Sequence, residues 1–176
     1  DRDEEEWVYL YTFFNAENQI AQRITKLDKA RNVKKVSNVE KELRLVEERT
    51  DIILSEKQKE AVKAINDNNV TIITGGPGTG KTTIIKSIIE IYKQKKYKIV
   101  LCAPTGRAAK RMSETTGEEA STLHRLLEIG KVDEESLFKK DNEYQGAPID
   151  GDIIIVDEVS MVDMFIMSYL LDCIYQ

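Results

Sequence analysis

The segment Gly-Gly-Pro-Gly-Thr-Gly-Lys-Thr at residues 75–82 constrains the fold of this chain more than any other feature. It matches the pattern G-x-x-x-x-G-K-[ST], in which glycines allow backbone N–H groups to close around phosphate oxygens. In such a loop the lysine reaches the β- and γ-phosphates, and the hydroxyl that follows it binds Mg²⁺. The pattern therefore predicts a site for a nucleoside triphosphate with Mg²⁺. The predicted binding residues are Gly76, Pro77, Gly78, Thr79, Gly80, Lys81, Thr82 and Thr83, with Lys81 also catalytic and Thr82 also a Mg²⁺ ligand.

The sequence on either side of this loop supports the prediction. Residues 70–73 are a β-branched run, Val-Thr-Ile-Ile, that predicts a buried strand. After the lysine, apolar residues at positions 84, 85, 88, 89 and 92 follow helical spacing. A strand, a loop and a helix in this order place the phosphates at a helix N-terminus, which favours anions. The alternative is a turn without a ligand, but a turn requires neither the lysine nor the threonine.

Two acidic residues, Asp157 and Glu158, directly follow the apolar run at residues 153–156. Such a run predicts an interior strand, and open α/β sheets bind ligands at the carboxyl ends of their strands. We expect Asp157 to hold Mg²⁺ through water and Glu158 to orient or deprotonate the attacking water, so that both are catalytic. The alternative is a solvated acidic pair at the end of a strand.

Composition narrows the class of protein. The net charge of −5 argues against a wholly basic DNA-binding protein, although a local basic face would be sufficient to bind nucleic acid. The two cysteines, Cys102 and Cys173, are far apart in apolar surroundings and are predicted to be buried free thiols. The sequence has no run of 18 apolar residues and no recognisable signal peptide, so we expect a cytoplasmic protein without a membrane partner.

The pattern of apolar residues divides the chain into two parts. We expect residues 1–50 to be an N-terminal helical segment that remains from a preceding domain, and residues 51–176 to be an α/β domain with a mainly parallel sheet flanked by helices. In the first part, a helical stripe covers residues 7–27, and Ser37 with Glu40 fits a capping box. Both ends interrupt a pattern, which suggests a fragment of a longer protein.

Gln58 has two interpretations that spacing alone does not separate. With Ser55 it fits a second capping box, which would explain both residues structurally. Its amide would also suit the paired donor and acceptor at the edge of adenine.

Basic and hydroxyl residues follow a second predicted strand at residues 98–103. The block at 104–112 contains three cations at the start of a helix, which suits a phosphate backbone, although a solvated helix face is the simpler explanation of the cations alone. The next block, residues 121–127, begins with a plausible N-cap at Ser121 and contains His124, the only histidine. A lone histidine more often packs or hydrogen-bonds than catalyses. Residues 130–149 are expected to form a surface excursion.

Five separated blocks, at residues 54–62, 75–83, 103–111, 121–127 and 157–163, resemble the RecD/TraA branch of superfamily 1 DNA helicases, which includes the α-subunit of exodeoxyribonuclease V. The resemblance spans residues 52–170. It implies the first RecA-like motor domain, a P-loop NTPase fold that binds ATP and Mg²⁺ in a cleft against a second motor domain of the same full-length chain. It also implies that Gln58 contacts adenine and that Asp157 and Glu158 serve as metal partner and base.

The resemblance further implies a DNA partner. The first DNA-contact motif of the family matches Pro104, Thr105, Gly106 and Arg107, and a second includes Thr122 and His124. We expect translocation on single-stranded DNA in the 5′ to 3′ direction, association with recombination nuclease subunits in some relatives, and almost no activity in the isolated fragment. The alternatives are an ATPase that acts on a protein partner and a nucleotide-binding module without turnover.

Overall fold

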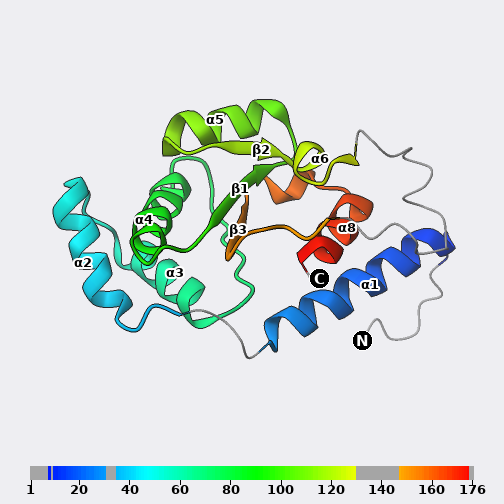
Figure 1. Ribbon diagram of the computed structural model, residues 1–176, viewed down its shortest axis with the longest axis horizontal. Coiled ribbons are helices and arrows are strands. Elements are labelled where there is room, and N and C mark those ends of the chain that lie inside the picture. The colour runs from blue at the N-terminus through cyan, green and yellow to red at the C-terminus, as the bar shows by residue number, and fades with distance from the viewer. Residues whose placement is uncertain (1–7, 9, 31–34, 130–146, 175–176) are drawn as a thin grey trace.

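The computed structural model describes residues 8, 10–30, 35–129 and 147–174 (Figure 1). Most of the predicted excursion at 130–149 lies outside these residues. The helices are α1 (Tyr11–Asp28), α2 (Val39–Thr50), α3 (Glu56–Asp67), α4 (Lys81–Gln94), α5 (Gly106–Thr116), α6 (Leu123–Leu126) and α8 (Met164–Ile174), with a short 3₁₀ helix, η2 (Val159–Met161). The strands are β1 (Ile99–Ala103), β2 (Ala120–Thr122) and β3 (Ile153–Val156).

The strands form one parallel sheet in the order β2-β1-β3. In its register Leu101 lies opposite Ala120 on one side and opposite Ile155 on the other. Parallel sheets require apolar cover on both faces, and helices provide it here. The predicted α/β class, with a parallel sheet flanked by helices, is therefore confirmed.

Alternate residues of the strands face opposite layers, as the pleat of a strand requires. One layer consists of α4 and α5, with α2 and α3 packed further out against α4. The opposite layer consists of α6 and α8. Ile99, Leu101, Ile153 and Ile155 pack toward the first layer, whereas Cys102, Ile154 and Val156 pack toward the second.

The strand predicted at residues 70–73 was wrong. None of these residues is in a strand of the described sheet, and Ile72 is 83% exposed. Only Ile73 packs against the cluster between α4 and the sheet. A β-branched run favours an extended backbone, but a strand also needs a hydrogen-bonded neighbour, and local sequence cannot supply one.

β3 also differs from its prediction as an interior strand. Among the described residues it pairs only with β1, so it lies at the edge of this sheet, and all four of its residues are half-buried. An apolar run of four residues shows that a strand is covered on both faces, but it does not show how many neighbours the strand has.

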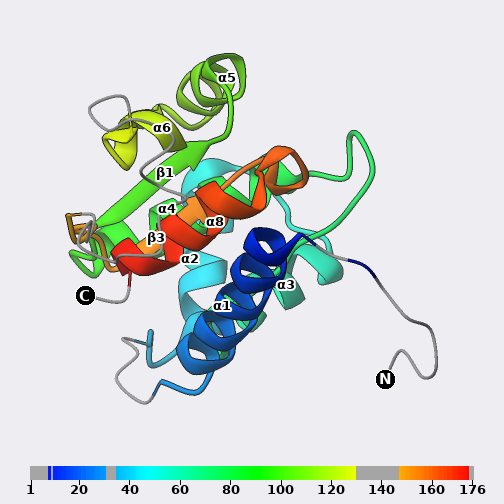
Figure 2. The same cartoon turned by 90° about the vertical axis from the view of Figure 1, so that its right-hand side faces the viewer.

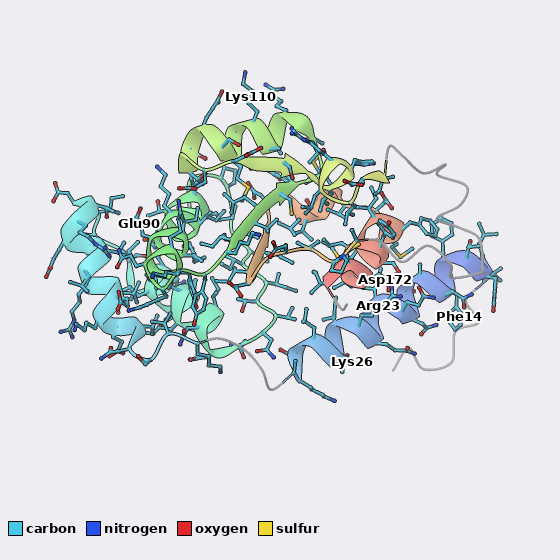
Figure 3. The ribbon with its side chains drawn as sticks, viewed as in Figure 1. Phe14, Arg23, Lys26, Glu90, Lys110 and Asp172 are labelled. Atoms are coloured by element: carbon cyan, nitrogen blue, oxygen red, sulfur yellow. The ribbon has the colours of Figure 1, made fainter. Side chains whose placement is uncertain are left out.

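Helix α1 packs along α8 (Figure 2). The Arg23 guanidinium donates to the Ser168 carbonyl at 3.0 Å and to its Oγ at 2.7 Å, and it forms an ion pair with Asp172. Figure 3 shows Arg23 and Asp172 meeting between the two helices. Burial raises the pKa of the Asp172 carboxyl, and Arg23 opposes this shift. Helix α1 is thus attached to α8, which covers one face of the sheet.

A second attachment lies at the C-terminal end of α1. The Asn69 side chain donates to the carbonyls of Leu27, Asp28 and Ala30 at 3.0, 3.1 and 2.7 Å. Leu27 and Asp28 are in the last turn of α1, where the carbonyls lack the regular partner four residues on, and the Leu27 carbonyl also accepts from the Ala30 N–H at 3.1 Å. The chain just before the phosphate loop therefore caps the N-terminal helix.

Two details of helix capping differ from the sequence prediction. Helix α2 is capped by the side chain of Asn38, which accepts from the Lys41 N–H at 3.0 Å, and not by Ser37. Helix α6 is capped by Thr122 and not by Ser121. In both pairs two adjacent residues are good N-caps, and the tertiary entry angle of the chain selects between them.

Both cysteines are free and buried, as predicted. Burial raises the pKa of the Cys102 thiol to about 12 and that of Cys173 to about 11. Both thiols are therefore protonated at neutral pH and act as packing groups. Among the helices that the structure describes, none has the length and apolar character needed to cross a membrane.

We predict that Arg23→Ala lowers the free energy of unfolding of the full-length protein by about 1–3 kcal/mol, because it leaves polar groups of α8 without a charged donor. The measurement is urea unfolding. The matched control is Gln22→Ala, the exposed neighbour on α1, which should change stability by less than about 0.5 kcal/mol. Equal effects of the two substitutions would show that the Arg23 contacts do not stabilise the docking of α1.

Candidate nucleotide and nucleic-acid site

The phosphate loop enters α4 through two glycines in the left-handed backbone region. Gly78 has φ +74° and Gly80 has φ +84°. Residues with a Cβ rarely adopt these angles, so the glycines are needed for the turn. Gly80 is the N-cap of α4, a helix of 14 residues, and its carbonyl accepts from the Ile84 N–H at 3.1 Å. The free N–H groups of the first helical turn are therefore available to an anion.

The Lys81 side chain folds back over the loop. Its Nζ donates to the Gly75 carbonyl at 2.6 Å and to the Gly76 carbonyl at 3.0 Å. The Thr79 hydroxyl also donates to the Gly76 carbonyl, at 2.9 Å. The Lys81 ammonium, which was predicted to bind phosphates, is thus hydrogen-bonded to two carbonyls of the loop. A bound phosphate must compete with these carbonyls for it. Gly75 contacts Lys81, although it was not among the predicted binding residues. Its position as the first glycine of the motif could have indicated this contact.

The space around the glycines distinguishes the walls of the loop from its open side. A Cβ added at Gly76 or Gly78 would meet no atom within 4 Å. A Cβ at Gly75 would lie 2.6 Å from the Thr79 hydroxyl, and one at Gly80 would lie 2.1 Å from the Gln58 amide nitrogen. The loop is thus closed at Gly75 and Gly80 and open between them, where phosphate oxygens would lie. This arrangement fits a nucleoside triphosphate.

The acidic pair lies at the carboxyl end of β3, as predicted. The Asp157 N–H donates to the Cys102 carbonyl at 2.9 Å and thereby extends the ladder between β3 and β1. Its carboxylate accepts from the Glu158 N–H at 2.9 Å. Asp157 is half-buried and Glu158 is exposed.

Glu158 has a left-handed backbone, with φ 53° and ψ 39°, at the N-cap of η2. For a residue with a Cβ this conformation costs about 1–2 kcal/mol. Strained backbone of this kind is concentrated at functional sites, where a side chain must be presented in one direction. Asp51, Lys96 and Glu128 have similar positive φ values, so the conformation alone does not distinguish Glu158 as functional.

A magnesium ion would find few protein ligands here, which is usual for this cation. No group of three or more His, Cys, Asp and Glu side chains gathers as a metal site within the described part of the chain. Mg²⁺ is commonly held by one or two protein oxygens together with water and substrate phosphates. The exposed hydroxyl of Thr82 at the start of α4 and the carboxylate of Asp157 are donors of the right kind.

The predicted DNA-contact residues lie at the same edge of the sheet as the acidic pair. Thr122 ends β2 opposite Ala103 of β1, and residues 104–107 follow β1 directly. Arg107 and His124 are exposed, whereas the hydroxyls of Thr105 and Thr122 accept from the Ala108 and Arg125 N–H groups as helix caps. The threonines therefore have a structural role whether or not they bind DNA.

Further exposed cations accompany these residues. Lys110 points outward from α5 in Figure 3, and Arg111 on α5 and Arg125 on α6 are also exposed. Arg125 was not among the predicted contacts, although its position beside His124 was the available signal.

Gln58 satisfies the capping-box prediction. Its Oε1 accepts from the Ser55 N–H at 2.8 Å, and the Ser55 Oγ accepts from the Gln58 N–H at 3.3 Å. The amide nitrogen is directed at the phosphate loop and donates to the Thr79 carbonyl at 3.5 Å. A role for Gln58 in contacting adenine stays a prediction.

We predict that Glu158→Gly raises the free energy of unfolding of the full-length protein by about 1 kcal/mol, because glycine relieves the left-handed strain. Glu90→Gly is the matched control, since Glu90 is exposed within α4 and its replacement should lower stability by about 1 kcal/mol. Urea unfolding compares the two. Destabilisation of the same size by both variants would contradict the strain argument.

Comparison with known proteins places the chain in a family. A family model described as an AAA domain matches residues 58–176. The chain is 42% identical over 118 residues to the ATP-dependent RecD2 DNA helicase of Deinococcus radiodurans, with 67% of this chain and 16% of the relative covered. It is 35% identical over 187 aligned positions to the RecBCD enzyme subunit RecD of Buchnera aphidicola, with 95% of this chain and 30% of the relative covered.

A phage protein shows the same relationship. The chain is 40% identical over 129 residues to the ATP-dependent DNA helicase dda of Enterobacteria phage T4, with 69% of this chain and 29% of the relative covered. The chain thus spans less than a third of the length of each of these relatives. With a matched domain that includes the phosphate loop and the acidic pair, the chain belongs to the AAA domain family and is a segment of the RecD helicase type.

Proposed function

We propose that the protein containing this chain is an ATP-dependent DNA helicase in which residues 51–176 belong to the first motor domain and residues 1–50 to an N-terminal helical segment. The observation that carries the proposal is the arrangement at one edge of the sheet. The acidic pair follows β3, and β1 and β2 are followed by the helices α5 and α6, which begin near the exposed residues Arg107 and His124. The residues that hydrolyse the nucleotide and those that bind nucleic acid would thus lie at the same edge of one sheet.

Nucleotide binding rests on the phosphate loop. The N–H groups at the start of α4 and the Lys81 ammonium would bind the phosphates once Lys81 leaves the carbonyls of Gly75 and Gly76. Thr82 would hold Mg²⁺ directly and Asp157 would hold it through water. The ion would neutralise charge on the β- and γ-phosphate oxygens. Gln58 would contribute contacts to adenine.

Hydrolysis rests on Glu158. Its strained backbone presents the carboxylate to solvent beside Asp157, where it would orient the attacking water and accept its proton. The names of two relatives, which are ATP-dependent DNA helicases, support the use of ATP by the intact protein.

DNA binding would use the exposed side of α5 and α6. Arg107 and His124 are exposed there, and the N-caps of both helices lie at the same edge. We expect single-stranded DNA as substrate, movement from 5′ to 3′, and a second motor domain in the same full-length chain. Because the relative from Buchnera aphidicola is named as a RecBCD enzyme subunit, recombination nuclease subunits are candidate partners, and we expect a cytoplasmic location for such a role.

The test of this proposal is ATP hydrolysis by the full-length protein with and without single-stranded DNA. We expect strong stimulation by DNA, and we expect Lys81→Ala to abolish turnover because it removes the cation that contacts the β- and γ-phosphates. Turnover that does not respond to DNA would instead favour an ATPase that acts on a protein partner. Unchanged turnover in Lys81→Ala would refute the phosphate-loop assignment.

A second prediction concerns Arg107. Arg107→Ala should weaken binding of single-stranded DNA and reduce the slope of log affinity against log salt by about 0.7, which is one phosphate contact on a single strand. Lys86→Ala is the control, because Lys86 is an exposed cation on α4 and not on α5 or α6, the helices that carry the proposed DNA contacts. The measurement is fluorescence anisotropy at several salt concentrations. Equal slopes for both variants would show that Arg107 does not contact a phosphate and is part of a solvated helix face.

A further inference from the structure

We propose that Gln58 is a positioning residue that holds the phosphate loop in place, in addition to any contact it makes with a base. This inference rests on the proposed function, since it concerns the same nucleotide site. It differs from the predicted adenine contact in its consequence. Gln58 would strengthen the binding of a ligand that has phosphates but no base.

Both ends of the Gln58 amide have partners. Its Oε1 accepts from the Ser55 N–H at 2.8 Å, so the cap of α3 fixes the orientation of the side chain. Its Nε2 then donates to the Thr79 carbonyl in a long hydrogen bond of 3.5 Å. The side chain therefore connects the start of α3 to the last residues of the phosphate loop.

The approach of the amide depends on the glycine at the end of the loop. A Cβ at Gly80 would lie 2.1 Å from Nε2 and 3.4 Å from Cδ of Gln58. The amide thus lies where any other residue at position 80 would place its side chain. Its contact with the loop covers the peptide between Thr79 and Gly80, which leads directly into the first turn of α4.

The helix that carries Gln58 is itself anchored. The Leu54 N–H, just before α3, donates to the Glu47 carboxylate at 2.8 Å, and Lys59 pairs with the same carboxylate at 3.2 Å. The hydrogen bond from Leu54 is the largest cause of a lowered pKa at Glu47, so this carboxylate stays ionised at neutral pH. Val62, one turn beyond Gln58, is fully buried. Because α3 is anchored in this way, the Gln58 side chain can restrain the phosphate loop.

The hydrogen-bonding capacity of the amide allows base and loop contacts at the same time. A primary amide has two N–H donors and an oxygen with two lone pairs. Ser55 uses one lone pair and Thr79 uses one N–H, which leaves one of each. Adenine offers N7 as an acceptor and its N6 amino group as a donor. The position of the loop and the recognition of adenine would therefore share one side chain.

The experiment is binding of Mg²⁺-tripolyphosphate and Mg²⁺-ATP to the full-length protein by isothermal titration calorimetry. Tripolyphosphate carries the phosphates of ATP without adenine. The variant is Gln58→Met, which keeps the length of the side chain and removes its hydrogen bonds without adding charge. Ser55→Ala is the control, because it weakens the same helix cap while leaving the Gln58 amide in place.

We expect Gln58→Met to weaken tripolyphosphate binding roughly fivefold, the value of one neutral hydrogen bond, and to weaken ATP binding more. Ser55→Ala should leave tripolyphosphate binding within about twofold of wild type, since stability and not the loop contact is lost. A loss confined to ATP, or equal losses in both variants, would overturn the inference. Lys81→Ala distinguishes the two levels: tripolyphosphate binding that does not need Lys81 would refute the proposed function itself.

Discussion

The parallel pairing of β1 with β3 is the interaction on which the candidate site depends. It extends one residue beyond the strands, where the Asp157 N–H donates to the Cys102 carbonyl. Because parallel strands end at the same edge, this pairing and the pairing of β1 with β2 bring the acidic pair and the exposed residues Arg107 and His124 to one side of the sheet. Apolar helices on both faces then fix the sheet, so the chemistry is presented by loops on a rigid support.

The sequence was sufficient for features that have a local cause. The helix after the phosphate loop, the strands β1 and β3 and the capping box of α3 all follow from periodicity or from residue pairs a few positions apart. The sequence was insufficient where the local structure depends on contacts with residues far along the chain. The run at residues 70–73 has the composition of a strand without a paired partner in the described sheet, and Asn38 rather than Ser37 caps α2 because the path of the chain selects one of two suitable residues.

For the site, the motif predicted which residues gather but not what each side chain contacts. Lys81 binds the carbonyls of its own loop, an arrangement that no spacing rule contains, because it depends on the curvature of the loop. The left-handed backbone of Glu158 was equally invisible, since glutamate has no preference for it. Gln58 shows the opposite case. Its two predicted roles were treated as alternatives, yet the amide has enough donors and acceptors for both.

The docking of α1 affects how this protein can be dissected. Asn69, which caps α1, precedes the phosphate loop, whereas Ser168 and Asp172, which bind Arg23, lie beyond the acidic pair. One helix from the N-terminal segment is thus tied to the chain on both sides of the site. A version of the protein shortened to begin at residue 39 would uncover the apolar side of α8 and lose this cross-connection, so its ATPase rate would report on a damaged domain. Domain limits for biochemical work should therefore include α1.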